Sequence, residues 1–247
     1  MERVTVRVLQ GATLAAIGLV WEAASRGGLL DPLFVPPPSA VAAALGPVAA
    51  LALPRLGETL LKTLAGYAIA VGVGVGLGLV LGAARTPREV VMPYVTALYS
   101  LPKILLVPWV VLLLGVRPQA AVLGGALFAV FPILVQVVGG VRDVEPILLT
   151  VARAMGTTRW QLYGKVIVPA ALPAILASMR VGAVFAFVGV LLTEMFAGIR
   201  GMGFLMHQLA LAFNAPFLFA ATAMISVFSV ATVLWLAHWN RRLGAWR

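Results

Sequence analysis

Residues 63–84 read TLAGYAIAVGVGVGLGLVLGAA and contain no charged side chain. Because a helix needs about 20 apolar residues to cross a hydrocarbon core roughly 30 Å thick, this stretch predicts a membrane-spanning helix. The rest of the chain has the same character: 62% of its 247 residues are hydrophobic and 11% are charged, and its mean hydropathy is +1.05. Soluble domains usually contain about a quarter charged residues. The composition therefore excludes a soluble, disordered or fibrous protein and predicts an integral membrane protein with several spans.

Apolar windows of sufficient length recur along the chain. They predict an all-α fold, a polytopic membrane helix bundle with about six transmembrane helices. The uncharged run over 201–240 is too long for one helix. Asn214-Ala215-Pro216 divides it, because proline removes a backbone donor and restricts the residue before it. A short segment at 201–213 then precedes the last span. The six expected spans are 8–24, 63–84, 92–115, 119–141, 172–198 and 217–239.

The distribution of Lys and Arg predicts the orientation, since cytoplasmic loops of membrane proteins hold an excess of these residues. With both termini inside, the inside loops hold eleven of the 18 basic residues, namely Arg3, Arg7, Arg85, Arg88, Arg142, Arg153, Arg159, Lys165, Arg241, Arg242 and Arg247. The outside loops hold Arg26, Arg55, Lys62, Arg117 and Arg200. We therefore expect both termini in the cytoplasm. The net charge of +10 is then the basic excess of cytoplasmic loops and not a sign of nucleic-acid binding.

The first span allows two interpretations. Arg3 and Arg7, a short apolar run and then Glu22-Ala23-Ala24-Ser25 fit a cleaved signal peptide. They also fit a span that is retained, and we favour a retained span at 8–24. In either case the residues that follow it lie outside.

Residues 26–57 form the first external segment. Its stretch Val35-Pro36-Pro37-Pro38-Ser39 is stiff and polyproline-like. Ser39 is expected to cap an amphipathic or interfacial helix over 40–52, which ends near Pro54.

Small residues recur every fourth position within the apolar run that opened this section. They are Gly66, Ala70, Gly74, Gly78 and Gly82. On a helix this register forms a smooth groove that allows another backbone to approach closely. The pattern predicts a tightly packed helix and assigns no function by itself.

The chain contains no recognisable catalytic constellation. It has no cysteine and two histidines, His207 and His238, and it lacks the HExxH, GxSxG and Walker motifs. We therefore expect no catalytic residue, no metal site and no cofactor in this chain. Lys103 and Glu194 are ionisable residues within apolar spans, where such groups usually face a bundle interior or a wet cavity. Either they belong to a substrate path, or they pair with freed carbonyls and a neighbouring helix.

The largest polar island is the loop over 142–165, between the fourth and fifth spans. Asp143 and Glu145 precede Pro146, which suits the first turn of a helix. Gly156 ends this helix, and Thr157 or Thr158 caps a second short helix. We expect the second helix to cover residues 159–163 and to stop at Gly164. The apolar residues that share one face of the first helix are Ile147, Leu148, Val151, Ala152 and Met155. Such an elbow suits a partner's groove better than a lipid surface.

The same loop resembles the EAA loop of permease subunits of ATP-binding-cassette (ABC) importers. That loop reads Glu-Ala-Ala, three spacers, Gly, nine spacers and Ile-x-Leu-Pro. Here the corresponding residues are Thr150-Val151-Ala152, Gly156 and Val166-Ile167-Val168-Pro169. The spacing matches throughout, and Ala152, Gly156 and Pro169 are kept. The departures are Thr150 for Glu, Val151 for Ala, Val166 for Ile and Val168 for Leu.

Further stretches across the chain are similar to a branch of these permeases for nitrate, aliphatic sulfonates, taurine and pyrimidine thiamine precursors. They are Val35–Ser39, Leu101–Pro108, Ala152–Gly156, Pro169–Pro173, Met179–Gly182 and Glu194–Gly203. The resemblance implies the type I (MetI-like) importer permease fold. It implies a single transmembrane permease domain over 1–247, with an N-terminal span at 8–24, a five-helix core at about 58–240 and a cytoplasmic coupling loop at 142–165. It also implies a multi-pass protein of the cell (inner) membrane.

The resemblance implies the following assembly. Two identical permeases form one pathway, two ATP-binding subunits bind ATP and Mg²⁺ below it, and a periplasmic or lipid-anchored solute-binding protein delivers substrate. The chain itself is then no enzyme and binds no nucleic acid. The residues to which the resemblance assigns coupling to the ATPase are Thr150, Val151, Ala152, Arg153, Ala154, Met155, Gly156, Thr157, Arg159 and Trp160.

Two rival classes find less support in the residues. An ion-coupled secondary transporter typically has buried acids and inverted repeats, but only Glu22 and Glu194 fall within spans and no repeat is evident. An intramembrane protease needs a nucleophile and a base at membrane depth, and the two histidines have no evident partner in the sequence.

Overall fold

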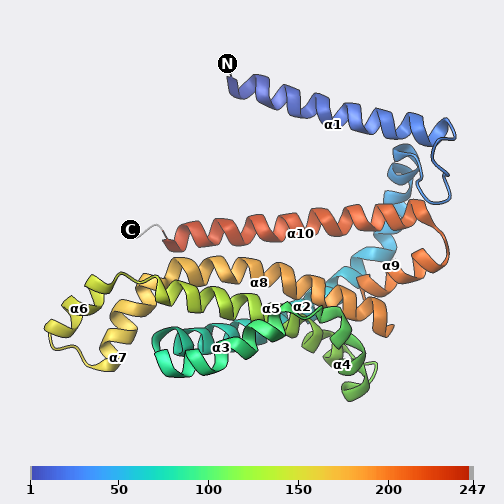
Figure 1. The fold of residues 1–247 in the computed structure, drawn as a ribbon. Helices are drawn as coiled ribbons and strands as arrows, with labels where there is room; N and C mark the ends of the chain where they lie inside the picture. Colours follow the sequence, from blue (N-terminus) through green and yellow to red (C-terminus); the bar gives the residue numbers. More distant parts are fainter. Residues whose placement is uncertain (1, 245–247) are drawn as a thin grey trace. The chain divides into compact units, whose positions relative to one another are not determined.

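The computed structural model describes residues 2–244, with side chains described over residues 5–232. Arg3, His238, Arg241, Arg242 and Arg247, named above, lie outside the described side chains. The described residues are helical and contain no strand (Figure 1), as the sequence predicts. They divide into two compact units, which we describe separately. The first comprises the chain up to Arg55 together with Leu205–Phe228, and the second comprises Leu56–Phe204 and the chain from Ser229.

The helices follow one another with short connections. The long helices are α1 (Glu2–Arg26), α2 (Pro38–Ala83), α3 (Arg85–Ser100), α5 (Pro118–Arg142), α8 (Val168–Ala197) and α10 (Ala215–Gly244). The shorter ones are the 3₁₀ turn η1 (Lys103–Leu106), α4 (Val107–Leu114), α6 (Pro146–Ala154), α7 (Arg159–Leu162), the π-helical turn η2 (Tyr163–Ile167) and α9 (Met202–Leu211).

The described residues include five helices long and apolar enough to cross a membrane. A sixth span results if α3 and the segment Lys103–Leu114 form one broken span, in which the two parts meet at 91°. This bend lies at Leu101-Pro102, between the end of α3 and the start of η1. The division of the C-terminal apolar run is also confirmed, because α9 ends at Leu211 and α10 begins at Ala215.

The expected interfacial helix over 40–52 is wrong. Helix α2 begins at Pro38 and continues through Pro47 and Pro54 to Ala83. An interior proline costs a helix roughly 3 kcal/mol. Packing of the flanking residues offsets this cost, since Val48 and Ala52 are fully buried.

One consequence concerns Lys62, which the charge count placed in an external loop. It lies instead inside α2 and is 8% exposed.

Ser39 also has a different role from the expected cap. In the first unit, the Glu22 carboxylate of α1 accepts hydrogen bonds from the Ser39 N–H (3.0 Å) and the Ser39 hydroxyl (2.7 Å). Arg26 pairs with the same carboxylate at 2.5 Å. A carboxylate is favourable at a helix N-terminus, where the first N–H groups lack helical partners. The start of α2 is thus satisfied by α1 and not by Ser39 itself.

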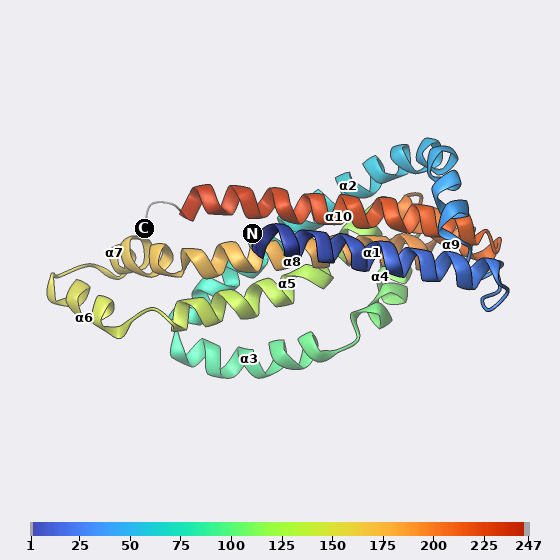
Figure 2. The same cartoon turned by 90° about the horizontal axis from the view of Figure 1, so that it is seen from above.

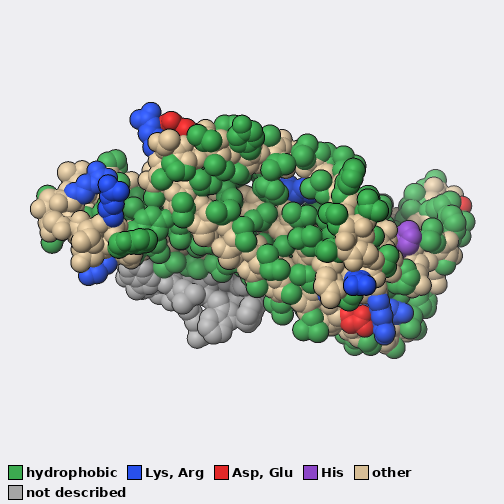
Figure 3. Space-filling model, turned by 90° about the horizontal axis from the view of Figure 1, so that it is seen from below, with side chains coloured by type: hydrophobic (Ala, Val, Ile, Leu, Met, Phe, Trp, Pro, Cys, Tyr) green, Lys and Arg blue, Asp and Glu red, His purple; other side chains and the backbone are tan. Residues whose placement is uncertain are grey.

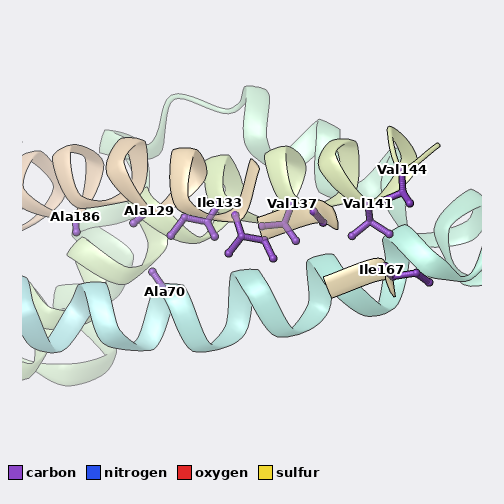
Figure 4. Packing of buried hydrophobic residues seen from close by; sticks show 10 residues of the cluster. Ala70, Ala129, Ile133, Val137, Val141, Val144, Ile167 and Ala186 are labelled. Carbon is purple, nitrogen blue, oxygen red and sulfur yellow. The ribbon is translucent and has the colours of Figure 1, made fainter. Parts of the chain in front are cut away.

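The core of the second unit is formed by α5, α8 and the part of α2 that belongs to this unit. Figure 4 shows Ala70 of α2 facing the row of α5 side chains that includes Ile133, Val137 and Val141. The glycine register lies against the same row. A Cβ on Gly74, Gly78 or Gly82 would come within 3.0 Å of Ile133, Val137 or Val141 respectively. The predicted close approach of another helix is confirmed, and that helix is α5.

Candidate functional site

The predicted elbow is present as a hairpin formed by α6 and α7, which Figure 1 shows beyond the ends of α5 and α8. Helix α6 begins at Pro146, where the absent proline N–H costs nothing at the first helical position. It ends before Gly156, which has φ +73°, a left-handed conformation that favours glycine. The Thr157 hydroxyl donates to the Ala152 carbonyl at 2.8 Å and closes the turn.

A capping box starts the second helix of the hairpin. The Thr158 hydroxyl accepts from the Gln161 N–H at 3.3 Å, and the Gln161 side chain accepts from the Thr158 N–H at 2.9 Å. Of the two caps that the sequence allowed, the structure therefore selects Thr158. The reciprocal bonds satisfy two N–H groups that a four-residue helix leaves without helical partners.

The predicted stop at Gly164 is wrong. The chain continues from α7 through η2 directly into α8. A proline ring clashes with the carbonyl four residues earlier, so Pro169 at the start of α8 would disturb the carbonyl of Lys165 in a regular α-helix. Lys165 lies in the wider π-helical turn η2, and such turns accommodate local interruptions of a helix. The helix can therefore continue past Gly164 into α8. The hairpin and the fifth span therefore form one continuous helical path.

We expect Thr158→Ala to loosen the hairpin by about 1 kcal/mol, because the Gln161 N–H loses its cap. Amide hydrogen exchange over residues 159–162 of the purified protein measures this effect, and exchange should become faster there. Thr158→Ser keeps the accepting oxygen and should exchange as the wild type does. Equal protection in the alanine and serine variants would show that the cap does not stabilise α7.

Large apolar side chains of the hairpin remain exposed. The exposed fraction is 78% for Met155 and 87% for Trp160, and Ile147, Leu148 and Val151 are also exposed. Ala152 differs from its predicted neighbours on this face, because it is buried. Exposed apolar patches of this kind mark interaction sites. The remaining predicted coupling residues Thr150, Arg153, Ala154, Gly156 and Arg159 are exposed, and Thr157 is half-buried.

A second constellation lies around Glu194 of α8, which is fully buried. Lys62 Nζ lies 2.7 Å from its carboxylate, and the Thr59 hydroxyl lies 3.0 and 2.9 Å from the two oxygens. The Gly203 N–H donates to the same carboxylate at 3.0 Å, and Lys62 also donates to the Arg200 carbonyl. The Glu194 carboxylate therefore joins α2 to the end of α8 and to the turn that follows it.

Two glycines make room for this constellation. A Cβ on Gly201 would overlap the Glu194 carboxylate, and a Cβ on Gly203 would overlap the Leu191 carbonyl. Both glycines fall within the stretch Glu194–Gly203 that carries the family resemblance, but the sequence did not identify Lys62 and Thr59 as partners of Glu194. The Lys62–Glu194 bond spans 132 residues, and local pattern gives no signal for a contact at that separation. The structure thus places Glu194 in a buried ion pair, and its role in a substrate path stays a prediction.

Lys103 has a local partner. Its Nζ donates to the Tyr99 carbonyl at 3.0 Å and lies 4.5 Å from the centre of the Tyr99 ring. In an uninterrupted helix this carbonyl would accept from the N–H of residue 103, and the break after Ser100 removes that bond. The side chain of Lys103 replaces it. Among the described contacts none joins Lys103 to Glu194, and a substrate-path role for Lys103 also stays a prediction.

Residues 68–245 match a family model described as "Binding-protein-dependent transport system inner membrane component". The taurine transport system permease protein TauC of Escherichia coli (strain K12) is 27% identical over 241 residues, which cover 95% of this chain and 88% of the relative. The relative named "Putative aliphatic sulfonates transport permease protein SsuC", from Bacillus subtilis (strain 168), is 28% identical over 155 residues. The match covers 63% of this chain and 56% of the relative.

Among solved structures, an inward-facing form of the MetNI methionine ABC transporter contains a chain that is 22% identical, with a TM-score of 0.68. The match covers 80% of this chain and 96% of the solved chain. At this identity the match is a likeness of fold, and it confirms the predicted MetI-like architecture.

Proposed function

Because this chain belongs to the family of binding-protein-dependent transport system inner membrane components, we propose that a separate ATP-binding subunit drives it by docking on the α6–α7 hairpin. The chain is the permease subunit of an ABC importer, a multi-pass protein of the inner membrane. Its family implies ATP-binding and solute-binding partners. In our proposal two identical copies form one pathway, ATP is hydrolysed by the partner subunits alone, and residues 1–247 act as one permease domain.

The exposed apolar residues of the hairpin support docking. Met155 and Trp160 project from it, and a partner groove would remove their apolar surface from water. The continuous path α7–η2–α8 supports transmission, because a rigid helical connection carries a displacement of the hairpin into a membrane span. ATP binding would then favour one conformation of the permease through its higher affinity for that state. The coupling role covers Thr150–Thr157, Arg159 and Trp160.

The orientation in this proposal has both termini in the cytoplasm and the first span retained. The hairpin region contains Arg142, Arg153, Arg159 and Lys165, and such residues are concentrated in cytoplasmic loops. The hairpin then faces the ATP-binding subunits, and the solute-binding protein docks on the opposite side of the membrane.

The substrate in this proposal is a small organic anion such as taurine or another sulfonate, or a related nitrogen or sulfur nutrient such as nitrate. Support comes from the names of the two relatives described above. A pyrimidine thiamine precursor is the second substrate class. The two classes are distinguished by thermal shift of the cognate solute-binding protein with taurine, other sulfonates, nitrate and pyrimidines.

The docking proposal predicts that Gly156→Asn strongly reduces ATP-driven uptake in proteoliposomes. Asparagine tolerates the left-handed conformation of this position, and a Cβ there meets no atom of the chain within 4 Å. The fold should therefore persist while the added side chain obstructs the docked partner. We expect docking to weaken at least about tenfold, equivalent to about 1.4 kcal/mol, in co-purification with the ATP-binding subunit.

Gly164→Asn is the matched control, because a Cβ at Gly164 also meets nothing within 4 Å and the position is not among the proposed coupling residues. It should retain uptake. Normal uptake and normal ATPase docking in Gly156→Asn would contradict the assignment of coupling to this turn.

A further inference from the structure

Four arginines line a cavity of about 390 Å³ at the base of the hairpin, within the second unit. They are Arg88 of α3, Arg142 at the end of α5, Arg153 of α6 and Arg159 of α7. Figure 3 shows Lys and Arg side chains at both ends of the view, including the hairpin end, with a mostly apolar surface between them. No acidic residue lines this cavity, so its charge favours an anion.

The hydrogen-bonding capacity of these guanidinium groups is largely unused within the described part of the chain. Arg88 donates to the Gly82 carbonyl at 3.1 Å. Arg142, Arg153 and Arg159 form no ion pair with any carboxylate of the described residues. Arginine presents donors in a planar fork that matches the oxygens of a phosphate.

Tyr163 also lines this cavity. The Tyr163 hydroxyl is buried and has no hydrogen-bond partner among the described residues. Leaving a buried donor unsatisfied destabilises the folded protein, so such atoms are uncommon in native structures. A ligand oxygen in this cavity would accept the hydrogen bond.

A second cavity, of about 650 Å³, adjoins the first and shares Arg88 and Arg142 with it. It lies along α3 and α5, and its mostly apolar lining includes Met92, Pro93 and Val138. Glu89 also lines it, and the Glu89 carboxylate is paired with Arg85. An arginine cavity beside a mostly apolar one suits an amphiphile with a charged head and a hydrocarbon tail. Basic pockets between membrane helices bind lipid head groups in this way.

We propose that the two cavities form a binding site for an anionic phospholipid. Its phosphate lies among Arg88, Arg142, Arg153 and Arg159 and accepts from the Tyr163 hydroxyl, and its acyl chain lies against Met92, Pro93 and Val138. A free phosphate would use the arginine cavity alone and would leave the apolar cavity unexplained. A bound lipid at this place would tie α3 and α5 to the base of the hairpin.

The test uses the full-length permease purified in a neutral detergent, with added phosphatidylglycerol, phosphatidylcholine or inorganic phosphate. Native mass spectrometry measures bound lipid, and thermal shift measures stabilisation. We expect phosphatidylglycerol to bind at least about tenfold more tightly than phosphatidylcholine, and inorganic phosphate to compete weakly. Equal binding of the two lipids, or equal stabilisation by phosphate alone, would overturn the proposal.

Three variants locate the site. Arg142→Gln should lower phosphatidylglycerol affinity about tenfold, and Tyr163→Phe should lower it severalfold, since this variant removes a hydrogen-bond donor to the phosphate. Lys165→Gln is the control, because Lys165 is an exposed cation near the base of the hairpin and lines neither cavity. Arg142→Gln and Lys165→Gln should melt as the wild type does without lipid. Equal losses of affinity in Lys165→Gln and Arg142→Gln would show that only the general surface charge matters, and would overturn the proposal.

The complex of the permease with its ATP-binding subunit allows a final test. Phosphatidylglycerol that remains bound when the ATP-binding subunit is attached supports a lipid site beside the docking surface. Displacement of the lipid by that subunit would assign the arginines to the protein interface and overturn the proposal.

Discussion

Lys62→Met is expected to lower the free energy of unfolding by about 3–5 kcal/mol, the cost of leaving one partner of a buried ion pair uncompensated. The variant leaves the Glu194 carboxylate, which is fully buried, without its only cationic partner among the described contacts. The Arg200 carbonyl loses a donor as well. Thermal or denaturant unfolding of the purified protein in detergent measures the change.

Two further variants separate this effect from a general loss of charge. Glu58 lies one turn earlier on α2 and pairs with Arg200 at 3.1 Å, with side chains 34% and 78% exposed. Glu58→Gln should therefore cost no more than about 1 kcal/mol, as exposed pairs do. The double variant Lys62→Met with Glu194→Gln removes both buried charges and should recover part of the lost stability. Wild-type stability in Lys62→Met alone would mean that the ion pair contributes nothing to the fold.

Gly66→Ala is expected to destabilise the protein by about 1–3 kcal/mol, the usual cost of overpacking a well-packed core. A Cβ there would lie 2.6 Å from the Val122 carbonyl oxygen and 3.2 Å from the Ala126 nitrogen. Both are backbone atoms of α5, so no side-chain rotation relieves the overlap and the two helices must separate. The melting temperature in detergent and the yield of folded protein report the effect.

Gly72→Ala provides the matched control, because a Cβ on this residue meets nothing within 4 Å. It lies on the same helix, and alanine is favoured over glycine within helices by about 0.5–1 kcal/mol. This variant should be neutral or slightly stabilising. If the two alanine variants shift stability in the same direction by similar amounts, the close approach of α2 and α5 does not limit the fold.

The membrane class, the spans and the hairpin were predictable because each depends on residues close together in the chain. Hydropathy over about 20 residues predicts a span, and proline and glycine mark helix ends through their own backbone geometry. The register from Gly66 to Gly82 predicted a close helix contact, although the pattern did not identify α5 as the partner. The errors at Pro54 and Gly164 have one cause, since both are helix-breaking signals that the packing and continuity of the surrounding helix overrode.

The sequence by itself therefore determined that the chain is a membrane-embedded helix bundle with an elbow at 142–165, because the cost of exposing apolar side chains or burying backbone polar groups is set locally. Only the tertiary structure decided which distant groups meet. The Lys62–Glu194 pair and the cavity formed by Arg88, Arg142, Arg153, Arg159 and Tyr163 depend on how separate helices pack. A charged side chain can be accommodated by whichever partner the packing brings within reach, and its own neighbours in the chain do not reveal that partner.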